Sequence, residues 1–142
     1  MSYTLREHTA DVAVAANAPT LSALFDAVAD GLAAASAETI PDAGDRFRIS
    51  VRAESREAVL FDFLDQLIYE RDVRLVLPAD VHSTVDHDPA SDANEGEWSV
   101  TATARGVPFS DVSAREIKAV TYSEMTLERR DGGWYAYVVF DV

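Results

Sequence analysis

Two stretches of the chain place hydrophobic residues at the helical intervals of three and four positions. The first stretch follows Pro19-Thr20 and carries the apolar residues Leu21, Leu24, Phe25, Val28 and Leu32. The second follows Ser55, a residue type that caps helix N-termini, and carries Val59, Leu60, Phe63, Leu64, Leu67 and Ile68. Both patterns predict amphipathic helices that bury one face.

Most of the remaining chain alternates apolar and polar residues with the period of two that is typical of β-strands. Strands are predicted over residues 2–7 and 11–17, and a third strand contains the alternating Phe47, Ile49 and Val51. After the second helix, further strands are predicted over residues 73–77, 81–85, 98–104, 116–122, 125–128 and 134–140. An acidic loop is predicted over residues 86–97, and Asp131-Gly132-Gly133 predicts a tight hairpin turn.

This order of elements predicts an α+β fold in a single domain, residues 1–142. We expect two helices packed on one face of a mixed, largely antiparallel β-sheet, which makes a two-layer sandwich. A length of 142 residues, 48% of them hydrophobic, is enough for one core. No segment approaches the roughly 18 apolar residues of a membrane span, and the N-terminus does not resemble a signal peptide, so we expect a soluble cytoplasmic protein.

Acidic residues outnumber basic ones, with 25 Asp and Glu against 12 Lys and Arg and a net charge of −13. Such a chain repels a phosphate backbone, so we expect no strong direct binding of nucleic acid. The acidity, with Lys118 as the single lysine, resembles the composition of proteins from salt-loving archaea. The absence of cysteine excludes disulfides, thiolate metal sites and cysteine nucleophiles.

Three small groups of residues carry candidate chemistry. His8-Thr9-Ala10-Asp11 lies between the first two strands, where Asp11 either binds a cation or caps the turn. Asp141 and the α-carboxylate of Val142 place two anions side by side, unless the chain end frays into water. Lys118 is either a solvated surface charge or a compact ammonium with a specific role.

Two of these groups would form one site if the final strand pairs with the strand that begins at Asp11. Asp11, Asp141 and the Val142 carboxylate would then converge as hard oxygen ligands, which suit Ca²⁺ first, and also Mg²⁺ or Mn²⁺. The sequence contains no phosphate-binding loop, dinucleotide fingerprint, zinc-protease motif or nucleophile elbow. The strongest sequence signatures of enzymes are therefore absent, and the proposed metal site depends on the pairing of those two strands.

Four segments, in order along almost the whole chain, resemble the archease family: EHTADVAVAA, LFDFLDQLIYE, IKAVTYSEM and GGWYAYVVFDV. The resemblance implies an accessory protein of the RtcB-type tRNA-splicing RNA ligase, which joins ends bearing a 2′,3′-cyclic phosphate and a 5′-hydroxyl. Family members promote formation of the ligase's histidine–GMP intermediate and its repeated turnover. The resemblance also implies a divalent metal site at Asp11, Asp141 and the Val142 carboxylate, a functional lysine at Lys118 and a contribution from His8.

The chain departs from the family pattern at two places. Ser123 follows KAVTY where the family often has histidine, and GVPFSDVSARE replaces a segment that usually continues with Arg-His. Two other functions stay open: a stand-alone metal-dependent phosphohydrolase using Asp11, Asp141 and His8, and a general chaperone or RNA-modification helper. Phosphate-ester turnover by the purified protein alone, or suppression of the aggregation of unrelated proteins, would distinguish these alternatives.

Overall fold

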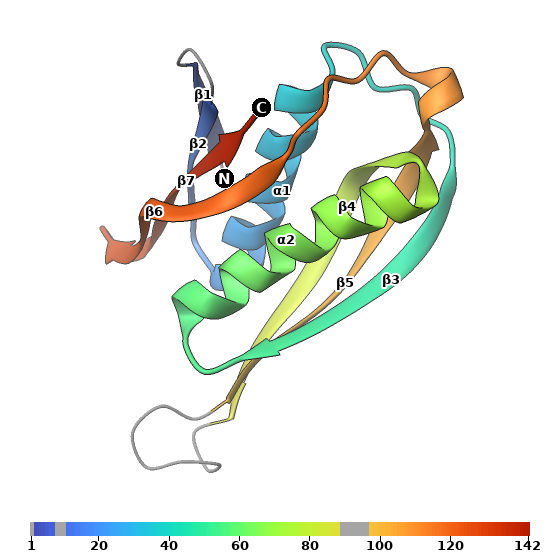
Figure 1. The fold of residues 1–142 in the computed structure, drawn as a ribbon. Coiled ribbons are helices and arrows are strands. Elements are labelled where there is room, and N and C mark those ends of the chain that lie inside the picture. Colours follow the sequence, from blue (N-terminus) through green and yellow to red (C-terminus); the bar gives the residue numbers. More distant parts are fainter. Residues whose placement is uncertain (1, 8–10, 89–96) are drawn as a thin grey trace.

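The expected α+β class with two helices is confirmed by the computed structural model, which describes residues 2–7, 11–88 and 97–142 (Figure 1). In chain order the elements are β1 (Ser2–Glu7), β2 (Asp11–Ala18), α1 (Leu21–Ser36), β3 (Asp45–Ala53), α2 (Arg56–Arg74), β4 (Val76–Asp88), β5 (Glu97–Pro108), the 3-10 helix η1 (Phe109–Asp111), β6 (Ala119–Arg130) and β7 (Gly133–Asp141). No helix among the described residues is long and apolar enough to cross a membrane.

The strands form two sheets, and every described pairing is antiparallel. One sheet has the order β1-β2-β7-β6 and the other has the order β3-β5-β4. The expected single mixed sheet is thus refined into two, because alternation shows which residues share a face but not which strand lies next to which. Each helix bridges the sheets: α1 contacts β2 and β4, and α2 contacts β3 and β6.

The helix starts follow from the residues that cap them. Thr20 Oγ1 accepts a hydrogen bond from the Ala23 N–H, and Ser55 Oγ accepts one from the Ala58 N–H, each at 3.1 Å. Leu75 ends α2 in the left-handed conformation, with φ of 57°. The helix therefore includes Val73, which strand alternation had placed in a following strand.

Other predicted strand boundaries also differ from the structure. The strands expected at 73–77 and 81–85 are one strand, β4, whose pairing with β5 is irregular between Ala79 and His82. The strands expected at 116–122 and 125–128 are one strand, β6, whose pairing with β7 is irregular between Thr121 and Thr126. Asp131 and Gly132 form the expected turn with φ of 48° and 78°. β4 extends to Asp88 and β5 begins at Glu97, so residues 89–96 of the predicted loop lie outside the described residues.

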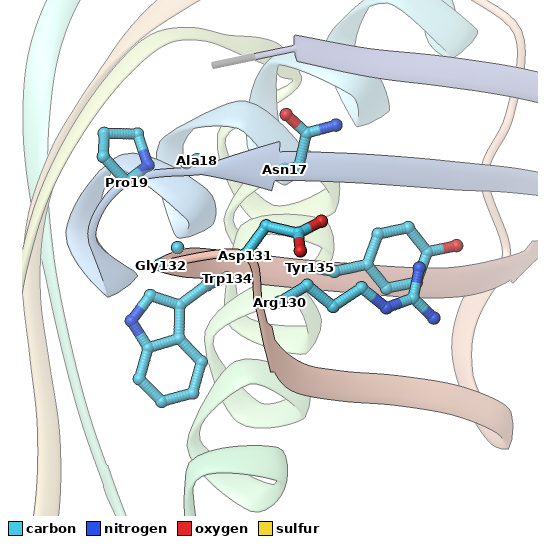
Figure 2. Close-up of a pocket in the computed structure, with 9 residues that line it drawn as sticks. Asn17, Ala18, Pro19, Arg130, Asp131, Gly132, Trp134 and Tyr135 are labelled. Atoms are coloured by element: carbon cyan, nitrogen blue, oxygen red, sulfur yellow. The ribbon is translucent and has the colours of Figure 1, made fainter.

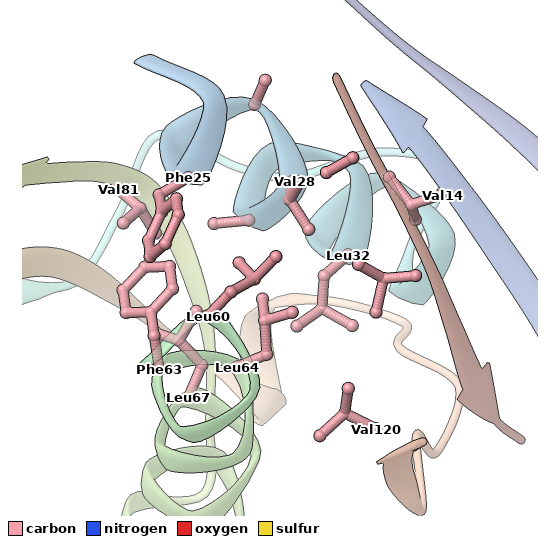
Figure 3. Close-up of a cluster of buried hydrophobic side chains, with 14 of the residues drawn as sticks. Val14, Phe25, Val28, Leu32, Leu60, Phe63, Leu64, Leu67, Val81 and Val120 are labelled. Atoms are coloured by element: carbon pink, nitrogen blue, oxygen red, sulfur yellow. The ribbon is translucent and has the colours of Figure 1, made fainter. Parts of the chain in front are cut away.

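The main core lies where the two helices meet between the sheets. The rings of Phe25 on α1 and Phe63 on α2 stack with centroids 5.7 Å apart, and Val14 of β2 and Val120 of β6 close the cluster from the other side (Figure 3). Burial of each large side chain here stabilises the fold by about 1.5–3 kcal/mol. This core fixes β2, β6 and β7, the three strands that carry the candidate site.

Acidic side chains lie where α1 packs against β4, and one of them, Asp30, has a raised pKa. The carboxylate of Asp26 accepts hydrogen bonds from the N–H (2.8 Å) and Oγ (2.6 Å) of Ser83. Burial, together with the negative charges of Asp26 and Asp80, raises the pKa of nearby Asp30 to about 6. In the unfolded chain Asp30 has its ordinary pKa of 3.8. Compared with the unfolded chain, the folded state therefore favours the neutral carboxyl group of Asp30.

Asp30→Asn should consequently stabilise the protein in a pH-dependent way. The penalty for ionising Asp30 is absent below pH 3.8, grows as the pH rises, and is complete above about pH 6. The variant should gain on the order of 1 kcal/mol in unfolding free energy at pH 7.5, and little at pH 4.0, because Asp30 is half-exposed. Denaturant unfolding at both pH values measures this difference, with the exposed Asp86→Asn as control. An equal gain at both values would contradict the assigned shift.

Candidate metal centre

The antiparallel pairing of β2 with β7 sets two acidic side chains opposite each other. In this register Asp11 lies directly across from Asp141, and Val12 lies across from Phe140. The expected pairing of the final strand with the strand that begins at Asp11 is thereby confirmed. Directly opposed residues have Cβ atoms about 4.5–5.5 Å apart, so one cation can reach both carboxylates.

The electrostatics of this pair favour a cation. Like charges directly opposite each other on neighbouring strands are destabilising. In addition, Asp11 Oδ1 is buried and has no hydrogen-bond donor among the described residues. An unsatisfied buried acceptor costs about 1–3 kcal/mol. A hard divalent ion would satisfy this oxygen and screen the repulsion, so the residues present fit such an ion.

Lys118 and Val142 lie at the same end of the sheet. The Lys118 N–H donates to the Asp141 carbonyl at 2.8 Å, and Ala119 pairs with Asp141 across β6 and β7. The side chain of Val142 is partly buried against the main core, which contradicts a last residue that frays into water. The Lys118 side chain is exposed and forms no ion pair within the described part of the chain.

Two other residues that the sequence analysis singled out, His8 and Ser123, have no described contact with the Asp11–Asp141 pair. His8 lies outside the described residues. Ser123 is exposed in the irregular stretch of β6. Within residues 2–7, 11–88 and 97–142, no three His, Cys, Asp or Glu side chains gather as a metal site. Beyond the Asp11–Asp141 pair, the candidate ligands are the Val142 carboxylate, a backbone oxygen, water, a partner or a residue outside the described ranges.

An open hollow of about 570 Å³ lies at the opposite end of β2 and β7 (Figure 2). It surrounds the turn from Arg130 to Gly133, and the guanidinium of Arg130 lies 3.8 Å from the ring centroid of Tyr135. β2 separates this hollow from Asp11 by roughly 20 Å or more at about 3.4 Å per residue. The hollow is therefore a separate feature from the acidic pair.

Sequence reasoning missed Arg71, which ties down the segment leading to Lys118. Its side chain is 6% exposed on the inner face of α2, and Nη2 donates to the Arg115 carbonyl. The Arg115 N–H in turn donates to the Ser36 carbonyl at 2.8 Å. Burial lowers the pKa of Arg71. Its one signal in the sequence is a charged residue four positions after Leu67 on an apolar stripe.

Comparison with known proteins decides the family. The model of the "Archease protein family (MTH1598/TM1083)" matches residues 3–142. This chain belongs to the archease family. It is 32% identical to the protein archease of Methanosarcina mazei, over 99% of this chain and 95% of that protein. It is 30% identical to the protein archease of Pyrococcus furiosus, over 96% of this chain and 95% of that protein.

Two solved structures share the fold of this archease-family chain. The solution structure of Methanobacterium thermoautotrophicum protein 1598 matches with a TM-score of 0.77 and 25% identity, over 99% of this chain and 98% of that one. The crystal structure of a Thermotoga maritima archease, described as a possible chaperone, matches with a TM-score of 0.62 and 23% identity, over 96% and 94%. The second likeness concerns the fold alone.

Removing one charge of the acidic pair should reverse the order of stability between the metal-free and metal-loaded proteins. In EDTA, Asp11→Asn and Asp141→Asn should unfold at the same or a higher temperature than the unchanged protein, because repulsion across the strands is relieved. In millimolar Ca²⁺ the unchanged protein should be the more stable one, because an ion that binds only the folded state stabilises it.

Differential scanning calorimetry in the two buffers measures this reversal. Asp131→Asn is the matched control, because Asp131 is exposed in the turn at the other end of β7 and has a φ that Asn tolerates. It should leave the Ca²⁺ response unchanged. The same Ca²⁺ response in all four proteins would contradict the metal centre.

Proposed function

We propose that this chain is an accessory protein of an RtcB-type RNA ligase, which promotes guanylylation of the ligase and its repeated turnover. Membership of the archease family supports the proposal. The observation that carries it is the direct opposition of Asp11 and Asp141, with the backbone of Lys118 bonded to Asp141. This arrangement places two anions and the single lysine at one end of one sheet.

In this proposal the residues of the centre have distinct roles. Asp11, Asp141 and the Val142 carboxylate hold a divalent ion, with Ca²⁺, Mn²⁺ and Mg²⁺ as candidates. Such an ion, when bound, orients phosphate oxygens of a nucleotide for attack. Lys118 offers a compact, exposed ammonium to a phosphate or to a carboxylate of the ligase. His8, which precedes β2 in the sequence, is a further proposed contributor.

The charge of the chain favours action through another protein. With a net charge of −13, this chain repels RNA, whereas a ligase must present basic surface to hold RNA. Complementary charge steers the encounter of two such proteins and raises their association rate. The acidic accessory protein therefore has a natural partner in an RNA-binding enzyme.

A general chaperone is a second candidate function. Exposed apolar side chains favour it, since Tyr69, Val73, Leu75 and Tyr122 are each more than half exposed. Unfolded clients bind to such apolar surface. A stand-alone phosphohydrolase has less support, because among the described residues no third His, Asp or Glu side chain gathers beside the two carboxylates.

Intact-mass spectrometry of the ligase distinguishes these functions. The ligase is incubated with GTP and a divalent metal, with and without this chain, and the fraction carrying added GMP is followed over time. The accessory role predicts faster guanylylation at substoichiometric amounts of this chain. Stimulation by unrelated chaperones to the same degree, or no stimulation at all, would contradict it.

Lys118→Ala should abolish the stimulation of guanylylation. The same change should alter the unfolding free energy by less than about 0.5 kcal/mol, because the side chain is exposed and its backbone N–H remains in place. Lys118→Arg should restore part of the stimulation, since it keeps the charge but not the compact shape. Full stimulation by the alanine variant would return Lys118 to the role of a solvated charge.

A short peptide added after Val142 should weaken both metal binding and stimulation. The extension converts the α-carboxylate into a neutral amide, and a lower ligand charge weakens binding of Ca²⁺. The fold should survive, because Phe140 and the residues before it keep their pairing with β2. Calorimetric Ca²⁺ titration and the intact-mass assay check this, with an N-terminal extension of equal length as control. Equal values for the two extended proteins would exclude the carboxylate as a ligand.

A further inference from the structure

The exposed large hydrophobic side chains of the described residues gather around α2. There are five of them: Tyr3, Tyr69, Val73, Leu75 and Tyr122, which are between 42% and 63% exposed. Tyr69 and Val73 lie on α2, Leu75 ends it, and Tyr122 lies on β6, a strand that contacts α2. Only Tyr3 lies elsewhere, on β1 at the far edge of the four-stranded sheet.

Tyr69 and Val73 share one face of α2 with two aspartates, and Tyr122 borders this face. Asp62, Asp65, Tyr69 and Val73 follow one another at intervals of three and four residues, so they share the outer face of α2. At the β6 side of this face, the ring of Phe61 stacks on Tyr122 with centroids 4.8 Å apart. We call the set Asp62, Asp65, Tyr69, Val73 and Tyr122 the α2 surface.

No described basic side chain lies within ion-pair distance of the carboxylates of the α2 surface. Asp62 and Asp65 form no ion pair within the described part of the chain. Partial burial, with the adjacent charge of Asp65, raises the pKa of Asp62. Burial and the charges of Glu57 and Asp62 likewise raise the pKa of the Tyr122 hydroxyl. Nearby cationic groups would relieve both effects.

We propose that the α2 surface is where this chain docks onto the RNA ligase, through a basic rim around an apolar pocket of the ligase. This inference rests on the function proposed above. Tyrosine is enriched among the residues that dominate interface energies, and the rim of an interface is typically polar. A ligase has basic side chains around its RNA-binding channel, and these complement the two unpaired aspartates.

The position of the α2 surface links docking to the acidic centre. Tyr122 and Lys118 lie four residues apart along the same stretch of chain, or about 13 Å in an extended conformation. A partner seated on Tyr122 therefore reaches the end of the sheet that carries Lys118 and Asp141. The ordinary size of a protein interface, about 800 Å² on each partner, spans both features.

Charge disfavours a second copy as the occupant. In a two-fold symmetric dimer the same patch lies on both sides of the interface, so four aspartates, Asp62 and Asp65 from each copy, would be brought into one interface. Each copy also carries a net charge of −13. The uncompensated repulsion opposes such a dimer and favours a partner of opposite charge.

The test compares binding with stimulation for matched variants. Tyr69→Ala combined with Val73→Ala removes the apolar anchors but keeps good helix formers, so α2 should remain intact. Tyr3→Ala removes an exposed tyrosine from the far sheet edge and serves as control. The dissociation constant for the ligase, measured by calorimetry, should rise at least about tenfold for the α2 variant and less than about twofold for the control.

Salt dependence tests the charged part of the surface. Asp62→Asn combined with Asp65→Asn should slow association and reduce the effect of added NaCl on the dissociation constant. All variants should keep the Ca²⁺ response of the unchanged protein, since Asp11 and Asp141 are untouched. Lys118→Ala should still bind the ligase while failing to stimulate it.

The outcomes separate docking from function. If the α2 variants bind and stimulate like the unchanged protein, the docking surface is wrong and the proposed function stands. If the unchanged protein neither binds nor stimulates the ligase, both proposals fall. If sedimentation shows a dimer of this chain that Tyr69→Ala with Val73→Ala dissociates, the surface joins two copies and the docking proposal is overturned.

Discussion

The pairing of β2 with β7 is the interaction on which the rest of the structure depends. These strands are the two inner strands of the four-stranded sheet, and their register sets Asp11 against Asp141. A slip of one residue would turn Val14 and Phe140, which are fully buried, toward the opposite face. The hydrophobic core thus enforces a register that the two aspartates alone would oppose. Repulsion between them is a local cost of the fold, and the cation proposed for this site would relieve it.

The sequence predicts those parts of the fold that depend on local chemistry. The helix starts at Thr20 and Ser55 and the turn at Asp131 follow from capping and positive-φ preferences that act over a few residues. The division into two sheets is not predictable in this way, because strand pairing is settled by contacts between residues distant along the chain. Val73 shows the same limit, since its β-branched side chain favours a strand, but the turns of α2 before it continue the helix.

The candidate site, too, is predictable from the sequence only in part. Asp11, Asp141 and Lys118 attract attention in the sequence because of their charge and position, but only the register shows that the first two are neighbours. Arg71 could not be assigned a role beforehand, because its value lies in hydrogen bonds that connect α2 to a segment more than 40 residues away. Family resemblance supplied roles for the charged residues, whereas the anchoring of the backbone around them became visible only in three dimensions.

That anchoring explains how a solvent-exposed lysine can be held in place. Residues 113–118 have no regular secondary structure, yet backbone groups of Arg115 bond to Arg71 and Ser36, and Ile117 is 2% exposed in the core. The Lys118 N–H then bonds to the Asp141 carbonyl. The position of the lysine is therefore set by its main chain and its neighbours, and its ammonium group forms no ion pair with residues 2–7, 11–88 or 97–142. A charge fixed in this manner keeps its capacity to bind an incoming phosphate or carboxylate, since no ion pair with the described residues has to be broken first.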